Sequence, residues 1–115
     1  MALNTNYLMG TMVGAAESAF AGSWQQIKTY TLPELEKIAS TIVSIEANVV
    51  AGHYTQSVAN LVLRMQLRAT QSVIVATTGL ILLQVEDALN KILGAIGDVV
   101  NAAIGFPLIA TGVRT

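Results

Sequence analysis

The longest regular pattern of apolar positions runs through residues 54–104, about fifty residues without a proline. As a single helix this stretch would be roughly 75 Å long, far beyond the three or four turns usual in globular proteins. It is therefore either one rod or two stacked helices. Glycine costs about 1 kcal/mol relative to alanine inside a helix, so Thr77-Thr78-Gly79 is the expected place for a kink or break.

Two apolar stripes follow this stretch. The downstream stripe alternates intervals of three and four residues, the spacing of a coiled-coil-like seam that two helices bury between them. Its members are Leu82, Val85, Leu89, Ile92, Ile96, Val99 and Ala103. The upstream stripe averages near 3.6 residues and suits ordinary helix packing. Its members are Val58, Leu61, Met65, Ala69, Val73, Ala76, Leu80 and Leu83. Residues 73–83 are apolar on nearly every face, so protein or lipid must surround them.

A first helix is predicted over about residues 5–28, with Asn4 or Thr5 as its cap. Its apolar face is formed by Met9, Val13, Ala16, Phe20, Trp24 and Ile27. Beside this face, small residues recur every four positions and form a ridge where another backbone can approach closely. The ridge consists of Gly10, Gly14, Ser18 and Gly22. Its three glycines should cost the helix a few kcal/mol, which favours a compensating close contact over chance spacing.

A second helix is predicted over about residues 33–51, after a loop at residues 30–33. Thr31 and Glu34 have the spacing of a capping box, and Pro33 would sit harmlessly in the first turn. The buried face repeats the seam spacing through Leu35, Ile38, Ile42, Ile45 and Val49. Gly52 is the expected C-cap, which would place the second and third helices antiparallel. If Gly52 failed to end the helix, the two would merge.

The third predicted helix covers about residues 55–104 and ends at Gly105, with Pro107 just beyond. Residues 105–115 form a tail whose apolar members should lie on a neighbouring surface. The expected fold is a single all-α domain over residues 1–115. It would be a helical hairpin or three-helix subunit with a long C-terminal helix kinked or broken near Gly79.

Composition adds a deficit of charge to this picture. Hydrophobic residues make up 53% of the chain and charged residues 11%, against about 25% charged in typical soluble domains. Six basic and seven acidic residues are too few to cover the exterior in the usual way. Much of the exterior should therefore be covered by contact with other molecules. A net charge of −1 argues against nucleic acid or an anionic membrane as the main partner. The absence of cysteine excludes disulfides and thiolate zinc sites.

No arrangement of residues indicates a chemistry. His53 is the only histidine, and the Glu-x-x-His pairs of a di-iron bundle are missing because Val49 and Leu89 follow Glu46 and Glu86 by three positions. We therefore expect His53 to be a turn or interface residue and expect no metal, cofactor or small-molecule substrate. Phosphate loops and activated nucleophiles are also missing, which argues against an enzyme.

Three groups of side chains remain to be placed. Glu17 either pairs with Arg64 or Arg68, which are one helical turn apart, or leaves both arginines solvated. Asp87 and Lys91 have the favourable order of a helical i to i+4 ion pair. The aromatic group Phe20, Trp24 and Tyr30 should be a packing anchor or an interface hot spot.

The function expected from these patterns is that of a non-enzymatic structural subunit. It would assemble with copies of itself through apolar helical faces into a large homo-oligomer such as a filament or tube. The expected interface consists of Gly10, Gly14, Ser18, Gly22, Phe20, Trp24, Val85, Leu89, Ile92, Ile96 and Val99.

The alternative is a small membrane-associated or pore-forming helical protein of a holin-like or pilin-like kind. Its best candidate segment, residues 69–85, has seventeen uncharged positions and is at the lower end of the spanning range. We expect no signal peptide because the N-terminus lacks a positive n-region. The compartment stays open: the cytoplasm, the outside of the cell and a virion are all compatible with the sequence.

Overall fold

The computed structural model describes residues 3–109, which form four α-helices and one short 3-10 helix. These are α1 (Thr5–Phe20), η1 (Ala21–Ser23), α2 (Trp24–Val50), α3 (Gln56–Thr78) and α4 (Leu82–Ile104). No strand occurs within residues 3–109, which confirms the all-α class predicted from the spacing.

The first fifty residues are divided differently from the prediction of helices at 5–28 and 33–51. α1 ends at Phe20, and η1 leads directly into α2 at Trp24. Ala21 makes this turn with φ of +48°, a backbone conformation that residues other than glycine rarely adopt. The rings of Phe20 and Trp24 stack with centroids 6.2 Å apart, and both side chains are buried. This aromatic pair therefore anchors the corner between α1 and α2.

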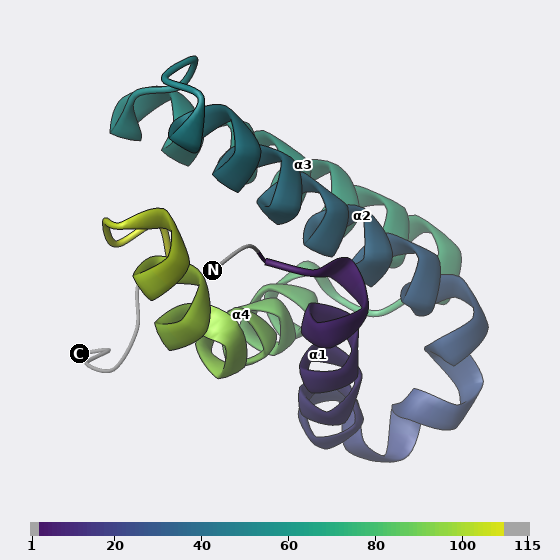
Figure 1. The fold of residues 1–115 in the computed structure, drawn as a ribbon. Coiled ribbons are helices and arrows are strands. Elements are labelled where there is room, and N and C mark those ends of the chain that lie inside the picture. The colour runs from purple at the N-terminus through teal and green to yellow at the C-terminus, as the bar shows by residue number, and fades with distance from the viewer. Residues whose placement is uncertain (1–2, 110–115) are drawn as a thin grey trace.

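Pro33 lies inside α2, so the predicted loop at residues 30–33 does not form. Proline has no N–H to donate to the carbonyl four residues earlier, and its ring crowds that carbonyl. The residue concerned, Thr29, is exposed, so water can hydrate the free carbonyl. α2 changes direction along its first third, as expected for a helix with an internal proline (Figure 1). Thr31, the predicted cap, is instead buried inside this helix.

The later helices end at or next to the glycines that were predicted to end or break them. Gly52 adopts φ of +82° and His53 N–H donates to the Asn48 carbonyl at 2.8 Å, which closes α2. Thr55 then caps α3 by accepting from the Val58 N–H at 3.2 Å. The predicted long C-terminal helix is divided into α3 and α4 at Gly79, whose φ is +76°. Gly105, with φ of +97°, ends α4.

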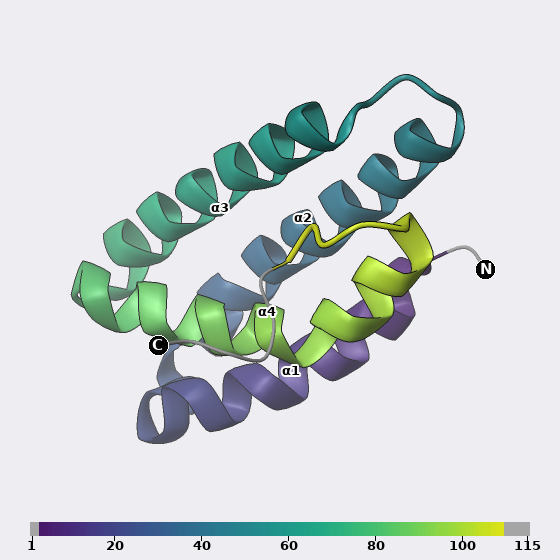
Figure 2. The ribbon, with the colours of Figure 1, turned by 90° about the vertical axis from the view of Figure 1, so that its left-hand side faces the viewer.

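The helices form two neighbouring pairs. α2 and α3 run side by side in opposite directions, while α1 packs chiefly against α4 and also against α2 (Figures 1 and 2). Direct contact between α3 and α4 is limited, although they are consecutive in the chain. The molecule measures 41 × 31 × 21 Å.

The core is built by one apolar stripe from each helix. The predicted seam of α4 is buried from Val85 to Ile96, and the predicted face of α2 is buried from Leu35 to Ile45. α1 buries Ala16 and Phe20 of the predicted face, but in its first half Leu8 and Met12 are fully buried in place of Met9 and Val13. The largest fully buried side chains are Leu8, Met12, Leu35, Ile38, Ile42, Ile45, Ile74, Val85, Leu89, Ile92, Ile96 and Val100.

Single polar side chains attach both ends of the described chain to the helices. Glu46 is buried in α2, and its Oε1 accepts from the Leu3 N–H at 2.7 Å. Asn101 in α4 both donates to the Ile109 carbonyl at 2.8 Å and accepts from the Ile109 N–H at 2.9 Å. Leu108 and Ile109 are buried, as predicted for the start of the tail, whereas residues 110–115 lie outside the described part.

Candidate functional site

The outer face of α3 exposes a line of apolar side chains. Val58, Leu61 and Met65 are 41%, 49% and 62% exposed, although their spacing of three and four residues is that of a helix face that packs. Ala69 and Ala76 continue the exposed line, with Val73 half-buried between them. The upstream apolar stripe predicted from the sequence is thus largely uncovered in the single chain. We call Val58, Leu61, Met65 and Ala69 the α3 face.

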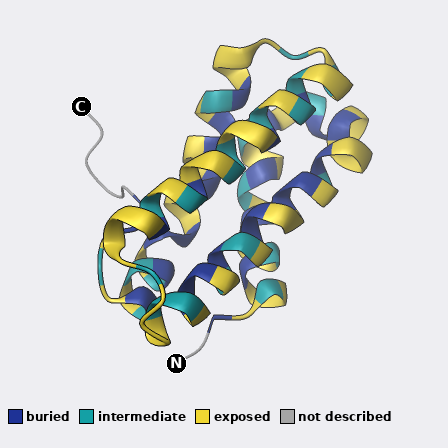
Figure 3. Ribbon diagram, turned by 90° about the horizontal axis from the view of Figure 1, so that it is seen from above, coloured by how far each residue is buried: buried dark blue, intermediate teal, exposed yellow. Residues whose placement is uncertain are grey.

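α3 leaves this face outside because it packs against α2 with its opposite side. That side buries Ala59, Leu63, Thr70 and Ile74. Thr70 is polar but satisfied: Gln66 Nε2 donates to its hydroxyl at 3.1 Å, and Thr41 of α2 donates to Gln66 Oε1 at 3.3 Å. The buried side of α3 therefore combines two large apolar side chains with an alanine and a hydrogen-bonded threonine. Seen from above, buried, intermediate and exposed residues alternate along the helices, because each helix has a buried side and an exposed side (Figure 3).

A shallow hollow of about 320 Å³ lies along the junction of the two helices. Its lining includes Thr41 from α2 and Val62, Met65, Gln66 and Ala69 from α3. Most of this lining is apolar, and Met65 has a flexible side chain that can adapt to a partner. The hollow therefore adds a concave, mostly apolar region beside the α3 face.

Two arginines border the α3 face. Arg64 and Arg68 are exposed and one helical turn apart, as predicted. Within residues 3–109 the only ion pair joins Lys37 Nζ to Glu34 Oε2 at 3.0 Å, so neither arginine has a carboxylate partner there. Glu17 is exposed on α1 and forms no ion pair with either arginine. The alternative with solvated arginines is the one observed.

A second apolar surface lies where α3 passes into α4. Thr78 Oγ1 accepts from the Leu80 N–H at 3.2 Å, which fixes the turn after Gly79. Ile81, Leu82 and Leu83 follow and are 66%, 51% and 63% exposed. Three consecutive large apolar side chains at a turn are costly to hydrate. We call Ile81, Leu82 and Leu83 the α4 corner.

The interface residues predicted from the sequence separate into two groups. Phe20, Trp24, Val85, Leu89, Ile92 and Ile96 are buried by the chain's own helices, and Val99 is half-buried. These seven residues therefore serve the core of the single chain. Gly10, Gly14, Ser18 and Gly22 are all exposed. A Cβ atom built on any of the three glycines meets nothing within 4 Å, so this ridge makes no close contact inside the chain.

The remaining polar candidates have structural positions. His53 lies exposed in the turn after α2, with Nδ1 3.3 Å from Asn48 Oδ1. Asp87 and Lys91 are both exposed on α4 and do not form the predicted ion pair. Tyr30 is exposed and does not join the stacked Phe20 and Trp24. No group of three or more acidic residues or histidine within residues 3–109 is close enough to hold a metal ion.

The sequence interpretation missed the exposure of the α3 face and of the α4 corner. A signal was present, because Ala59, Leu63, Thr70 and Ile74 also recur at helical spacing on the other side of α3. Two apolar stripes on different sides of one helix cannot both be covered by α2 alone.

Comparisons with known proteins identify no relative. No family model, no curated protein and no solved structure matches the chain. In the part of the chain that the structure describes, no helix combines the length and apolar character needed to cross a membrane.

Proposed function

We propose that this chain is a non-enzymatic structural subunit that assembles with copies of itself into a large homo-oligomer such as a filament or tube. The observation that carries the proposal is the α3 face, an apolar helix surface with packing periodicity that the chain's own helices leave in water. Burying such a face against protein is favourable by about 25 cal/mol per Å² of apolar area removed from water.

The scarcity of charge supports the same proposal. Soluble monomers usually keep apart through a surface rich in charged side chains, and this chain has only 11% charged residues with a net charge of −1. Little electrostatic repulsion therefore opposes contact between copies. The α4 corner supplies a second exposed apolar surface, and an open-ended assembly requires at least two contact surfaces on each subunit.

The direct test is the mass of the purified protein in buffer without detergent. We expect light scattering to show a high-mass species at micromolar concentration, and negative-stain microscopy to show regular particles. The species should persist over a wide salt range if apolar burial supplies most of the association energy. A monomer at micromolar concentration would contradict the proposal. Recovery only from detergent-solubilised membranes would favour the membrane-associated alternative.

A further inference from the structure

We propose that the copies join head to tail, with the α4 corner of one copy docked on the α3 face of the next. This inference rests on the proposed function, because it names the two surfaces that an assembly of this chain would bring together. Both surfaces are apolar and exposed in the single chain. They lie apart in the chain: sixteen residues and the helix break after Thr78 separate Met65 from Ile81.

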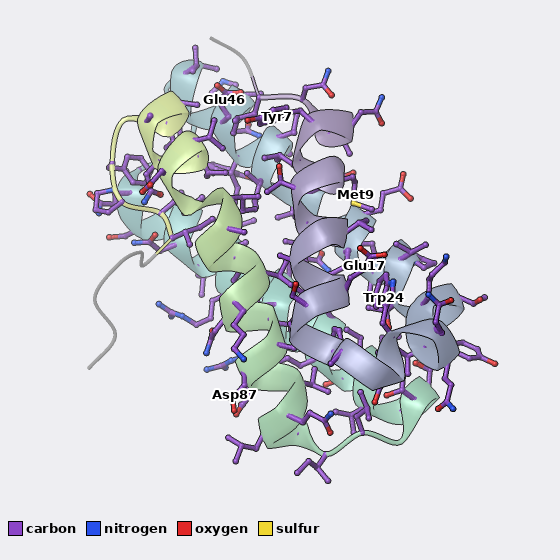
Figure 4. All side chains as sticks on the ribbon, turned by 90° about the horizontal axis from the view of Figure 1, so that it is seen from below. Tyr7, Met9, Glu17, Trp24, Glu46 and Asp87 are labelled. Carbon is purple, nitrogen blue, oxygen red and sulfur yellow. The ribbon has the colours of Figure 1, made fainter. Side chains whose placement is uncertain are left out.

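The α4 corner is followed within one turn by negative charge. Glu86 and Asp87 lie four residues after Leu82 and Leu83, so each carboxylate shares a side of α4 with one corner leucine. Asp87 is exposed and projects from α4 on the side away from α1 (Figure 4). Neither carboxylate is in an ion pair within residues 3–109. Lys91 lies one further turn along α4, away from the corner.

The α3 face carries the opposite charge. Arg64 is three residues after Leu61, and Arg68 is three residues after Met65, so both guanidinium groups border the apolar stripe. Both are without an ion-pair partner among the described residues. Both surfaces are apolar, and their charges are opposite. One has two adjacent acidic residues and the other has two basic residues one turn apart. Such matching orients partners and sets their register.

Charge also selects this contact over the symmetrical ones. Two α3 faces packed together would bring four arginines close to one another, and two α4 corners would bring four carboxylates together. Like charges facing each other across an interface cost free energy, whereas the head-to-tail contact pairs opposite charges. A head-to-tail contact uses different surfaces on the two copies and can repeat without limit. The occupant of the α3 face is therefore a second copy, and the product is a polar, open-ended chain of subunits.

The test exchanges the charges of the two surfaces separately. One variant carries Arg64→Glu with Arg68→Glu, and the other carries Glu86→Lys with Asp87→Lys. Each variant alone presents like charges at every head-to-tail contact, so we expect its assembly threshold to rise at least tenfold above that of the wild-type chain. Mixed in equal amounts, each variant's altered surface meets the other's altered surface with opposite sign. We therefore expect the mixture to regain assembly, with the two variants alternating.

A matched control carries Glu36→Lys with Asp98→Lys, the same change in net charge as the second variant at exposed positions outside both surfaces. It should assemble as the wild-type chain does. Circular dichroism establishes that every variant is folded before assembly is compared. Assembly of either charge-exchanged variant at the wild-type threshold, or a mixture that stays dispersed, would overturn the head-to-tail contact alone. A wild-type chain that is monomeric would overturn both this contact and the proposed function.

Discussion

Truncating Leu61 and Met65 to alanine tests whether the α3 face contributes to the proposed assembly, independently of folding. Both side chains are about half exposed in the single chain. Alanine is the strongest helix former, so the double variant should keep α3 intact. Surface substitutions of this kind usually change the free energy of unfolding by less than about 0.5 kcal/mol. We therefore expect the folded subunit to persist almost unchanged.

The expected effect on association follows from the exposed fractions. Full burial of a leucine or methionine side chain stabilises by about 1.5–3 kcal/mol, so covering the exposed half contributes about 1 kcal/mol per residue. The two truncations together should weaken each contact by about 2 kcal/mol, which is roughly a 30-fold loss in association constant. The threshold concentration for assembly should rise by a similar factor.

The assay is light scattering across a dilution series, with thermal unfolding followed by circular dichroism on the same samples. Val50→Ala is the matched control, because Val50 is a largely exposed apolar residue at the end of α2 and outside the α3 face. We expect its threshold to equal that of the wild-type chain. If the double variant and the Val50→Ala control assembled at the same concentration, the α3 face would not be an assembly surface.

Three further substitutions test other features. Ile92→Ala removes a fully buried side chain at the centre of α4 and should lower the free energy of unfolding by about 2–5 kcal/mol in a denaturant titration; a loss below 1 kcal/mol would contradict its place in the core. Thr31 is buried, and its hydroxyl has no hydrogen-bond partner among residues 3–109, so Thr31→Val should raise the free energy of unfolding by about 1–2 kcal/mol in the same titration. Gly14→Leu should keep its helicity and melt no lower, because open space surrounds the position, but should lose the large assembly if the α1 ridge contacts a copy; normal assembly by light scattering would exclude that ridge from the interface.

Helix ends marked by glycine could be predicted from the sequence, and the corner without such a mark could not. Gly52, Gly79 and Gly105 all adopt positive φ at the ends of helices, because only glycine does so without a steric penalty. The corner between α1 and α2 instead uses Ala21 at φ of +48°. Nothing in the local sequence distinguishes that alanine from its helical neighbours. The stacking that stabilises the turn becomes visible only once the helices are placed.

At Pro33 the local sequence predicted a helix start, but the proline lies inside α2. A proline in the first turn and a proline inside a bent helix follow from the same local sequence. The choice depended on burial of neighbours such as Leu35 and Trp24, which form one continuous buried face along α2. Tertiary packing outweighed the local preference to end the helix there.

The apolar stripes could be predicted from the sequence, but not which of them would remain exposed in the folded chain. The stripe through Leu61 and Met65 was recognised as apolar, and the seam through Leu89 and Ile92 was recognised as needing a partner. Periodicity identifies an apolar face on a helix but does not indicate which element covers that face. In the folded chain α1 covers the α4 seam, and α2 takes the opposite side of α3. The α4 seam therefore belongs to the core of the single chain, and the assembly that we propose uses the α3 face and the α4 corner instead.

The two hydrogen bonds between Asn101 and the backbone of Ile109 depend on an intact side-chain amide, so deamidation of Asn101 would disturb this attachment. Deamidation would replace the amide nitrogen of Asn101 with a carboxylate oxygen, which accepts hydrogen bonds and donates none. The contact of 2.8 Å with the Ile109 carbonyl would then bring two acceptors together. A single spontaneous reaction, with a mass change of about one dalton, would thus weaken the attachment of residues 105–109 to α4.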